Sequence, residues 1–557
     1  MLLDARAVEP QAGLDADICI VGAGAAGITL ALELVDRPVR VIVLEGGGTQ
    51  TDEDSQRLYQ GATTGQPYYE LDACRFRFLG GSTNAWGGWC RPLDAIDFMA
   101  RDWVPHSGWP FARDTLNPYY ERAHAMCRLG PCDYDAQRWN ADGASMVPPQ
   151  SRELADTLFH IRPIRFGQEY RGALEKASNV RLLLHATALE IEMDSAHQTA
   201  VRLSVGTPIG TRFAVRAGAY VLAAGGIENP RLLLASRQGR MSGIGNERDL
   251  VGRFFTEHLH VPVALVAARG RTPDFYAAHR VGGATIRGAV RITDDARRRE
   301  RLLGCALTFH NADDPHDVLS PARMPAAYES LGVLVRAMRR GERPPRILRH
   351  LGNVLTGVDS AAAFAYKKVR KVRARRLIVG CRAEQSPNPD SRVTLDDSVD
   401  AFGMPRARVH WQLTARDHES FDRAQTLWRR ELTEGGVELT SMATPEVPWM
   451  ARMSPGAHHT GTTRMHPDPS RGVVDEHCRV HGTRNVFVGG SSVFPTAGWA
   501  PPTLTIVALA FAAHAVLDVA HRRGVLPEDV VPRWYSVGCA IFNVYIGAVA
   551  YWPMLRR

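Results

Sequence analysis

A glycine-rich turn near the N-terminus constrains this chain more than any other feature of its sequence. The turn, residues 22–27, reads GAGAAG; it follows an apolar run at 17–21 and precedes a helix-compatible stretch at 25–35. A second apolar run, 39–44, ends in Glu45. This order predicts a βαβ unit built on a parallel sheet.

The three glycines of this turn suit a nucleotide pyrophosphate for steric reasons. Gly22 permits the tight turn, Gly24 lets the backbone approach a phosphate, and Gly27 lets the helix pack closely against the strand. The helix N-terminus offers unpaired N–H groups and a partial positive charge to the phosphates. Glu45 follows about 20 residues later, at a strand end where a carboxylate binds ribose hydroxyls. The turn alone leaves NAD and FAD open.

A second glycine cluster favours FAD. Residues 79–88 read LGGSTNAWGG. A nicotinamide enzyme has no use for such a cluster, whereas a flavin enzyme needs close backbone approach along a much longer cofactor. We therefore expect an FAD site that uses both glycine-rich segments.

The remaining elements predict one domain assembled from both ends of the chain. At 557 residues the chain is too long for one simple core, which indicates two domains. Strand-like runs at 180–184, 219–223 and 485–488 and helix-compatible stretches at 230–236 and 503–521 surround a long insertion, in which alternation at 392–395 and 407–413 suggests an antiparallel sheet. The expected division is a discontinuous FAD-binding domain (14–100, 178–259 and 450–525), a substrate-binding domain (101–177 and 260–449) and an apolar C-terminal tail (526–557).

Composition excludes several classes of function. The formal net charge is +8, but the excess is almost all arginine, and no interleaved aromatic and basic patch indicates nucleic-acid binding. The nine cysteines are scattered and odd in number, which predicts neither a disulfide framework nor a CxxC metal site. We expect no metal. The first residues lack a basic region followed by an apolar core, so we expect a cytoplasmic location.

Two segments leave a membrane or partner contact open. Residues 536–555 carry no charge and have aromatic residues near both edges, which suits a spanning or interfacial anchor; packing into a groove or a dimer partner needs the same residues. The arginine-rich region 336–376 is typical of a solvated helical face, or of a dock for an anionic membrane surface or acidic partner. Together the two segments allow a further interpretation of the function, as a membrane-docked assembly subunit with vestigial flavin chemistry.

Six segments in order resemble the glucose–methanol–choline (GMC) oxidoreductase family, particularly its bacterial, pyranose-oxidase-like branch. Beyond the first turn they are 80–88, 223–231, 251–253, 384–388, 458–465 and 485–505. The resemblance implies an α/β fold, α+β overall, with an FAD/NAD(P)-binding Rossmann-like domain of the glutathione-reductase type. It also implies an inserted substrate domain with an antiparallel sheet.

The resemblance further implies a reaction. A substrate CH–OH group loses its hydroxyl proton to a base while its carbon-bound hydrogen passes as hydride to flavin N5. The position that matches the family's catalytic histidine is His458, and a histidine with a pKa near its ordinary value of about 6.5 can accept a proton at neutral pH. We expect the neighbouring His459 to be structural.

Two departures from the family pattern matter. Ala85 stands where some relatives carry a histidine bonded covalently to the flavin, which predicts non-covalent FAD. Pro501 stands where relatives carry a second catalytic Asn or His, and its side chain can neither donate nor accept a proton. Losing such a partner costs about 10²-fold or more in rate when it stabilises developing charge. Either His458 acts alone, or another residue substitutes, or the reaction is not ordinary alcohol oxidation.

Pro501 and Pro502 still suit the start of a helix, because the N–H groups of a first turn lack helical partners. A helix beginning near Thr503 would aim its N-terminal N–H groups at the flavin N1/O2 edge. The expected catalytic residue is His458, and the expected cofactor-binding residues are Gly22, Gly24, Ala25, Gly27, Glu45, Gly81, Ser82, Trp86, Gly87, Ala188, Ala224, Gly225, Gly490, Ser491, Pro502 and Thr503.

The expected function is FAD-dependent oxidation of a CH–OH group in a sugar or larger alcohol. The alternative is a redox-neutral isomerase, lyase or cyclase on the same scaffold, motivated by Pro501. The motifs leave the electron acceptor, the substrate and the oligomeric state open.

Overall fold

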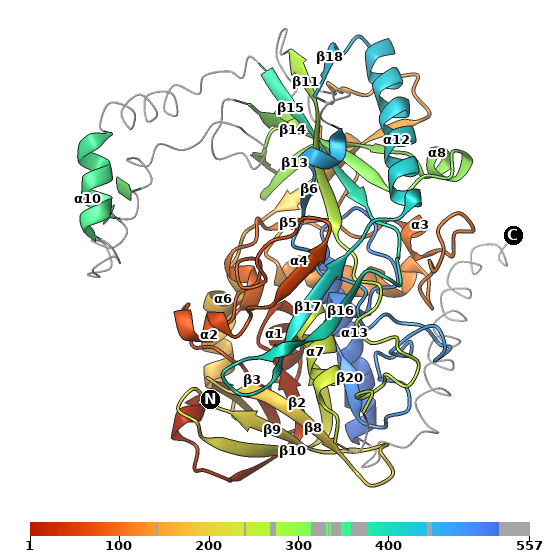
Figure 1. Cartoon of the computed structure of the whole chain (residues 1–557). Helices are drawn as coiled ribbons and strands as arrows, with labels where there is room; N and C mark the ends of the chain where they lie inside the picture. The colour runs from red at the N-terminus through yellow and green to blue at the C-terminus, as the bar shows by residue number, and fades with distance from the viewer. Residues whose placement is uncertain are drawn as a thin grey trace, which may run out of the picture.

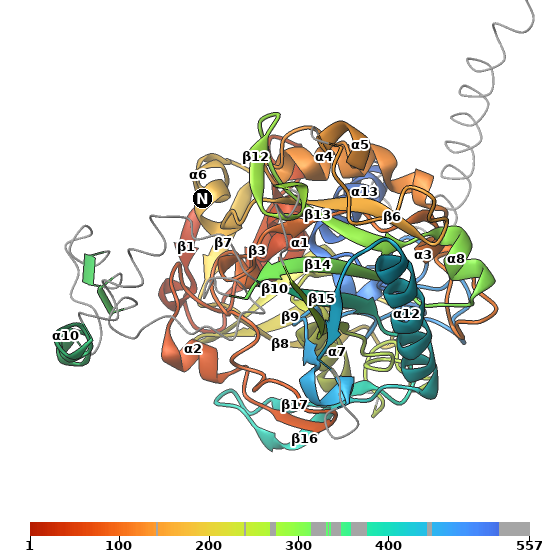
Figure 2. The same ribbon diagram turned by 90° about the horizontal axis from the view of Figure 1, so that it is seen from above.

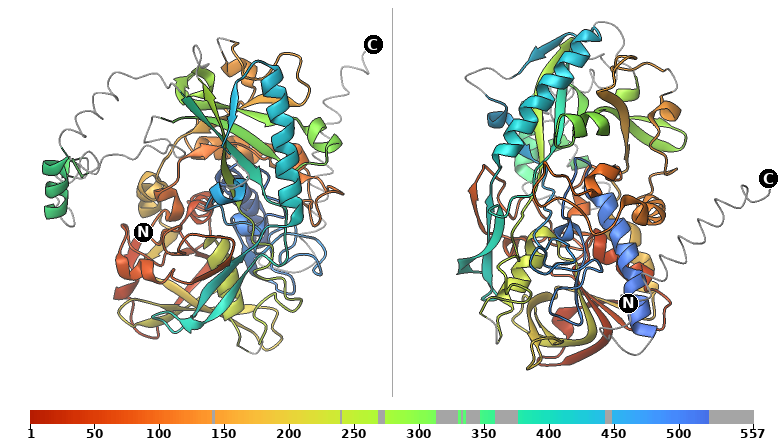
Figure 3. Two further views of the ribbon diagram at one scale, coloured as in Figure 1. Left: turned by 45° about the horizontal axis from the view of Figure 1, so that its top comes forward. Right: turned by 90° about the vertical axis from the view of Figure 1, so that its right-hand side faces the viewer.

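Two large β-sheets, each with its own hydrophobic core, form the body of the protein in this computed structural model (Figure 1). The structure describes residues 1–140, 143–238, 241–267, 274–312, 330–331, 334–335, 347–357, 376–442 and 448–522. The two sheets lie one above the other in Figure 1, and the same arrangement is visible from the side in Figure 3.

The lower sheet is mostly parallel and has eight strands. Its parallel strands are apolar and fully buried where helices cover both faces, as in the uniformly buried run Val41–Leu44. All pairings between neighbours are parallel except those of the last two strands in the order, which are antiparallel. The order is β1 (Leu2–Asp4), β7 (Val180–Leu184), β3 (Val41–Leu44), β2 (Gly13–Val21), β10 (Arg212–Leu222), β9 (Ala200–Gly206) and β8 (Thr187–Met193), and β20 (Val486–Val488) also pairs with β10.

Helices from distant parts of the chain cover this sheet. The set comprises α1 (Ala25–Glu33), α4 (Asn117–Met126), α6 (Phe166–Lys176), α7 (Gly225–Ala235) and α13 (Thr503–Arg522). α1 packs against both α6 and α13, and α13 also packs against α4. The parallel sheet, its βαβ start and the glycine-rich turn between β2 and α1 confirm the expected α/β fold class.

One helix begins earlier than expected. The sequence predicts helix-compatible residues at 230–236, but α7 begins at Gly225 and contains Pro230. Proline has no N–H to bond the carbonyl four residues before it. That carbonyl, of Gly226, instead accepts the hydroxyl of Thr462 at 2.6 Å, which satisfies it inside the helix.

The upper sheet is antiparallel and has nine strands. Its order is β18 (Leu439–Ser441), β11 (His258–Ala267), β15 (Arg376–Glu384), β14 (Cys305–Asn311), β13 (Ala284–Ile292), β6 (Leu154–Ile161) and β5 (Trp89–Cys90), with β12 (His279–Val281) on β13 and β19 (Ser454–Pro455) on β11.

A long helix, α12 (Ala415–Glu434), lies along the upper sheet (Figure 2). It begins at a capping box in which the side chains of Thr414 and Asp417 bond each other's backbone N–H groups. Its apolar residues, including Phe421 and Trp428, join the core of the antiparallel sheet. The periodic apolar face therefore attaches the helix to the sheet.

The two alternating stretches of the insertion form a hairpin that belongs to neither large sheet. β16 (Arg392–Val399) and β17 (Pro405–Trp411) pair antiparallel as expected, but β17 pairs on its other side with β4 (Ala62–Gly65), in parallel. Arg231 of α7 holds this small sheet, because its guanidinium bonds the carbonyl of Pro405 at 2.8 Å and Asp400 at 2.6 Å. The antiparallel pairing of these two stretches is as expected, whereas the third strand of their sheet, β4, comes from the N-terminal part of the chain.

Short elements complete the described chain: η1 (Ala5–Ala7), α2 (Glu53–Arg57), η2 (Gly81–Asn84), α3 (Ala95–Phe98), η3 (Arg113–Leu116), α5 (Ala136–Trp139), η4 (Asp274–Tyr276), α8 (Asp294–Arg299), α10 (Ile347–Thr356), η5 (Trp449–Arg452) and η6 (Ser491–Val493). Within the ranges described above, no helix has the length and apolar character needed to cross a bilayer. The apolar segment 536–555 and most of the arginine-rich region 336–376 lie outside the described residues.

Candidate active site

One cavity of about 670 Å³ receives residues from both large sheets. Its wall combines the turn after β2, the second glycine cluster, the turn between β10 and α7, the loop after β19 and the first residues of α13. The volume lies within the range of about 300–1,000 Å³ that is typical of ligand and cofactor sites.

The glycines of the first turn differ in what surrounds them. Gly22 has a φ of +103°, and a Cβ there would lie 2.7 Å from the carbonyl oxygen of Ala223. A Cβ on Gly27 would lie 1.9 Å from the carbonyl oxygen of Gly22, so this glycine lets α1 approach the turn. A Cβ on Gly24 would meet no protein atom within 4 Å, and Gly24 lines the cavity. The turn therefore leaves an open space beside the N-terminus of α1.

Glu45 lies on the cavity wall at the C-terminal end of β3. It is buried, and its carboxylate accepts hydrogen bonds from the backbone N–H of Ala23 at 3.1 Å and of Gly47 at 3.0 Å. Burial raises the pKa of this carboxyl, against the two backbone bonds and the nearby Arg77 charge. These bonds orient the carboxylate at the edge of the first turn.

The second glycine cluster adjoins the first. The N–H of Gly80 donates to the carbonyl of Ala23 at 2.8 Å, and a Cβ on Gly81 would lie 3.2 Å from the Cα of Gly24. The left-handed φ of Gly80, +100°, starts the turn that makes this approach possible. The structure thus brings the two sequence segments to one wall.

Almost every residue predicted to bind the cofactor lines this cavity. Gly27 is the exception, because it packs behind the turn. The lining residues from the predicted set are Gly22, Gly24, Ala25, Glu45, Gly81, Ser82, Trp86, Gly87, Ala188, Ala224, Gly225, Gly490, Ser491, Pro502 and Thr503.

The cavity also extends to the start of α13. Pro501, Pro502 and Thr503 all line it, and the helix begins at Thr503 with the N–H of Ile506 bonding the carbonyl of Pro502 at 2.9 Å. The unpaired N–H groups of the first turn give this end of the cavity a partial positive potential. The expected helix start at Thr503 agrees with the structure.

His458 lines the cavity from the loop that follows β19. Its Nδ1 lies 2.8 Å from Nδ1 of His258, the first residue of β11. Burial, and then the neighbouring His258, His260 and Arg382, lower the pKa of His458 well below its ordinary value. The ring is therefore a neutral base at neutral pH.

Sequence reasoning missed His258 and two neighbours, Glu257 and His260. Glu257 is fully buried, and its carboxylate accepts the backbone N–H of His458 at 2.8 Å and of His258 at 3.2 Å, together with the hydroxyl of Tyr68. Burial raises the pKa of Glu257 to about 7 despite these bonds. The available signal was the alternation of His258 and His260, because alternate residues of a strand share one face.

A cationic group was also missed. Arg382 of β15 and His260 line the cavity together, and Nη1 of Arg382 lies 3.3 Å from Nε2 of His260. The guanidinium lies over the Trp89 ring, 4.3 Å from its centroid. A cation over an indole face is held by the ring quadrupole, so Arg382 presents an oriented charge to the cavity.

His459 is held by a different set of contacts. Its ring stacks on Phe255 at a centroid distance of 5.9 Å, and its Nε2 lies 3.8 Å from Sγ of Cys74 and 3.7 Å from Glu257. Burial lowers the pKa of His459 to about 3.

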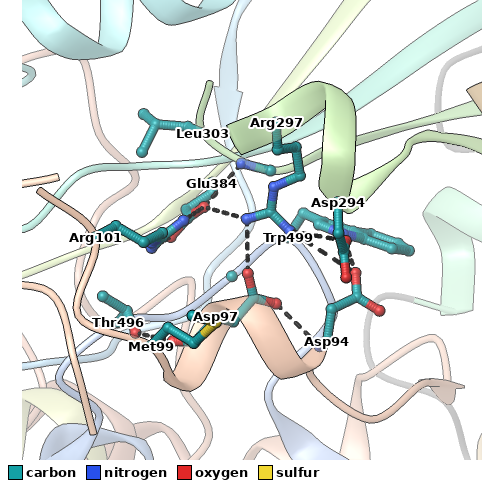
Figure 4. Close-up of polar contacts among 12 residues, drawn as sticks. Asp94, Asp97, Met99, Arg101, Asp294, Arg297, Leu303, Glu384, Thr496 and Trp499 are labelled. Atoms are coloured by element: carbon teal, nitrogen blue, oxygen red, sulfur yellow. Dashed lines mark hydrogen bonds and ion pairs between the residues drawn. The ribbon is translucent and has the colours of Figure 1, made fainter. Parts of the chain in front are cut away.

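A buried ionic cluster supports the loop that precedes α13 (Figure 4). Arg297 of α8 bonds Asp97 at 2.8 Å and Glu384 at 3.2 Å, and Glu384 also accepts both guanidinium nitrogens of Arg101. The loop joins this cluster through Thr496, whose hydroxyl bonds the carbonyl of Asp97 at 2.6 Å, and through Trp499. Among the residues that the structure describes, no group of three or more His, Cys, Asp or Glu side chains is arranged to hold a metal ion.

Two family models match the chain. The FAD dependent oxidoreductase model matches residues 17–353, more than half of the chain, and the GMC oxidoreductase model matches residues 387–510. The chain belongs to the FAD-dependent GMC oxidoreductases. This GMC oxidoreductase therefore uses FAD, as the two glycine clusters predicted.

Curated relatives match this GMC oxidoreductase over most of its length. It is 25% identical to the 2-methyl-1,2-propanediol dehydrogenase of Mycolicibacterium austroafricanum, over 89% of this chain and 94% of that enzyme. It is 24% identical to the fructose dehydrogenase large subunit of Gluconobacter japonicus, over 91% of this chain and 98% of that subunit.

A solved structure shares the fold of this GMC oxidoreductase. Pyridoxine 4-oxidase from Mesorbium loti superposes with a TM-score of 0.56 at 20% sequence identity, covering 90% of this chain and 98% of that one. The cavity wall fits close approach of a flavin nucleotide, because three of its glycines border open space. At Gly24, Gly225 and Gly490, which all line it, a Cβ would meet no protein atom within 4 Å.

Proposed function

We propose that this enzyme oxidises a CH–OH group of a sugar or larger alcohol, with His458 accepting the hydroxyl proton. Bound FAD supplies the acceptor for the hydride that leaves the same carbon. The observation that carries the proposal is the neutral His458 ring on the wall of the cavity that the two glycine clusters and the start of α13 also line. The relatives named for a diol and for fructose support an alcohol or sugar as the substrate class.

The two glycine clusters would hold the nucleotide part of FAD. Gly24 and the N-terminus of α1 would receive the pyrophosphate, and Glu45 would turn a carboxylate oxygen to the ribose. The first turn of α13 would place N–H groups against the flavin ring. We propose that attachment is non-covalent because Ala85, at the position of the family's flavin-linked histidine, has no nucleophile. Acid precipitation of the enzyme would then leave the flavin in the supernatant.

His458 meets the requirements of a general base. A base must be unprotonated at the working pH and must reach the proton that it removes. Burial keeps the pKa of His458 low, so the ring remains neutral across the physiological range. Its Nδ1 contacts His258, which leaves Nε2 for the substrate.

Arg382 is the proposed substitute for the polar residue that Pro501 cannot supply. Pro501 lines the cavity but offers no side-chain hydrogen bond. A guanidinium beside the base stabilises the negative charge that develops on the substrate oxygen as its proton leaves. Arg382 lies on the cavity wall with His260 and is close enough to His458 to lower its pKa.

The second candidate is a redox-neutral isomerase, lyase or cyclase that uses the same cavity. Pro501 favours it, because the polar partner expected opposite His458 is absent at that position. Anaerobic mixing with candidate alcohols separates the two candidates. Oxidation bleaches the visible flavin absorbance, whereas a redox-neutral reaction consumes substrate and leaves the flavin oxidised.

The His458→Ala variant tests the proposed base. We expect FAD to remain bound, because the two glycine clusters and the first turn of α13, which would hold it, are unchanged. We expect the rate constant of anaerobic flavin reduction to fall about 10²- to 10⁴-fold. His410→Ala is a control, since His410 lies on the small sheet and bonds Thr64 outside the cavity. Flavin reduction at the wild-type rate in His458→Ala would rule out His458 as the base.

A further inference from the structure

His458 and His258 share a single hydrogen bond between like atoms. The two Nδ1 atoms lie 2.8 Å apart, and the rings meet edge to face with centroids 5.0 Å apart. A neutral imidazole carries its hydrogen on one nitrogen and accepts at the other. One Nδ1 must therefore carry the hydrogen and the other must accept it.

The backbone at Gly498 decides which ring donates. Nε2 of His258 lies 2.9 Å from the carbonyl oxygen of Gly498 and 3.4 Å from that of Ala497. A carbonyl oxygen only accepts, so Nε2 of His258 carries a hydrogen. Burial lowers the pKa of His258 to about 4, so the ring is neutral and its Nδ1 is bare. The hydrogen in the shared bond therefore belongs to Nδ1 of His458.

We infer that His258 is a positioning residue that holds His458 in the Nδ1–H tautomer, with Nε2 as the basic nitrogen on the substrate side. The inference rests on the proposed role of His458 as the base and deepens it. The chain of donors and acceptors runs from His458 through His258 to the carbonyl of Gly498. His258 itself touches neither the substrate nor the cofactor in this arrangement.

The other neighbours of His458 cannot set its tautomer. His260 has its Nε2 turned to Arg382, and its ring centroid lies 5.9 Å from that of His458. Glu257 bonds the backbone N–H of His458, which fixes the main chain and leaves the ring nitrogens untouched. The described contacts give Nδ1 one partner, His258.

The carbonyl that anchors His258 is itself held firmly. Gly498 has a left-handed φ of +58°, and a Cβ there would lie 2.5 Å from Oδ2 of Asp97. The indole N–H of Trp499 bonds Asp94 at 2.9 Å, which attaches the next residue to the ionic cluster of Figure 4. The cluster thus fixes the loop whose carbonyl sets the orientation of both histidines.

Nitrogen-15 labelling of the histidine rings reads the tautomer directly. In oxidised holoenzyme, long-range proton–nitrogen spectra should assign a hydrogen to Nδ1 of His458 and to Nε2 of His258. The His458→Ala and His258→Asn variants identify the signals by their loss. A hydrogen on Nε2 of His458, or a bare Nε2 on His258, would overturn the inference whatever the activities are.

Two substitutions at one position separate tautomer control from packing. His258→Leu removes the acceptor for Nδ1 of His458, whereas His258→Asn keeps an oxygen acceptor close to that position. We expect flavin reduction to slow about 10²- to 10⁴-fold in His258→Leu, with the flavin spectrum and substrate dissociation constant unchanged, and to recover to within about tenfold of wild type in His258→Asn. A wild-type rate in His258→Leu, or equal rates in both variants, would contradict the inference.

His160→Leu is the matched control. His160 is as buried as His258 and bonds the carbonyls of Leu129 and Asp133, but it does not line the cavity. We expect its flavin reduction rate to equal that of the wild type. The experiments distinguish failure of the proposed base from failure of the tautomer assignment. A wild-type rate of flavin reduction in His458→Ala would show that His458 is not the base, whereas the nitrogen spectra test the tautomer whatever the rate is.

Discussion

At the scale of single residues, the site depends on groups that burial keeps in an unusual protonation state. His458 is held neutral, and its neighbour Glu257 is a buried carboxyl whose pKa is raised to about 7. Glu257 accepts hydrogen bonds from the backbone N–H groups of His258 and His458. Its protonation state therefore affects the stability of the backbone at the site rather than the proton transfer itself.

Glu257 predicts a specific pH dependence of stability. Its pKa rises from 4.5 in the unfolded chain to about 7 in the fold, so the folded state binds more protons between these values and stability falls as pH rises through this window. Below about pH 4.5 the protonated carboxyl contributes about 3 kcal/mol to the free energy of unfolding, and this contribution is lost by pH 7 and above. Glu257→Gln removes this titration, and its amide keeps one oxygen for the two backbone N–H groups.

We therefore expect the thermal midpoint of Glu257→Gln, relative to wild type, to rise steadily from about pH 4.5 to pH 7. Asp396→Asn is the control, because hydrogen bonds from the backbone of Ser398 and from Arg408 hold the pKa of Asp396 at about 2, below this range. Its difference from wild type should be constant over the same range. A constant difference for Glu257→Gln would contradict the prediction.

The residue scale also marks the limit of sequence reasoning. His458 and the residues on the cavity wall carry motif signatures, and their placement could be predicted. Strand β11 carries His258 and His260, and strand β15 carries Arg382. These side chains meet only because the two strands pair. Pairing partners across such distances depend on tertiary packing, which local patterns do not encode.

At the scale of elements, the turn between β2 and α1 was predicted most completely. The apolar runs at 17–21 and 39–44 became β2 and β3, and the helix ends within two residues of the expected position. The antiparallel pairing of β16 with β17 agrees with their alternating pattern. The parallel pairing of β17 with β4 does not follow from that pattern, because alternation predicts a strand with two different faces but not its neighbour. The predicted helix at 230–236 starts later than α7 does. Pro230 is accommodated inside α7 because the Thr462 hydroxyl, which is distant in sequence, bonds the carbonyl of Gly226.

Substitution by alanine is expected to affect the stability of the apoprotein differently at two glycines of the first turn. Gly27→Ala places a Cβ 1.9 Å from a backbone oxygen, so we expect it to lower the thermal midpoint of the apoprotein. Gly24→Ala meets no protein atom and should leave the apoprotein at least as stable as wild type, while weakening FAD binding by about tenfold or more, because its methyl group fills the phosphate side of the cavity.

Thermal unfolding of both apoproteins and fluorescence titration with FAD measure these effects. Gly172→Ala is the control, since a Cβ at this helical position meets nothing within 4 Å and Gly172 does not line the cavity. Tight FAD binding by Gly24→Ala would show that the phosphates do not approach this glycine.

At the scale of the whole molecule, the ionic cluster joins parts that come from distant regions of the chain. Arg297 and Glu384 belong to the antiparallel sheet and its α8, Asp97 belongs to α3, and the loop 496–499 leads into α13. Arg297, Glu384 and Asp97 are almost completely buried. Buried charges of this kind are costly unless every partner is present.

We expect Arg297→Met to lower the free energy of unfolding by about 3–5 kcal/mol, because Asp97 loses its partner and Glu384 loses one of two. Arg298→Met, the adjacent residue of α8, is the control; its pair with Asp295 is exposed and should contribute less than about 1 kcal/mol. Chemical unfolding of the two variants measures both effects. Equal stabilities would show that the cluster does not hold these parts together.

The position of β20 has a consequence for how the enzyme is made. β20, residues 486–488, pairs with the edge of β10 opposite to the N-terminal strand β2, and the cavity wall also needs Pro501, Pro502 and Thr503. During synthesis the parallel sheet therefore has an open strand edge until residues 486–488 have left the ribosome. We therefore expect flavin loading to be a late event, and a chain that stops before residue 486 to lack the strand and the helix start that complete the site.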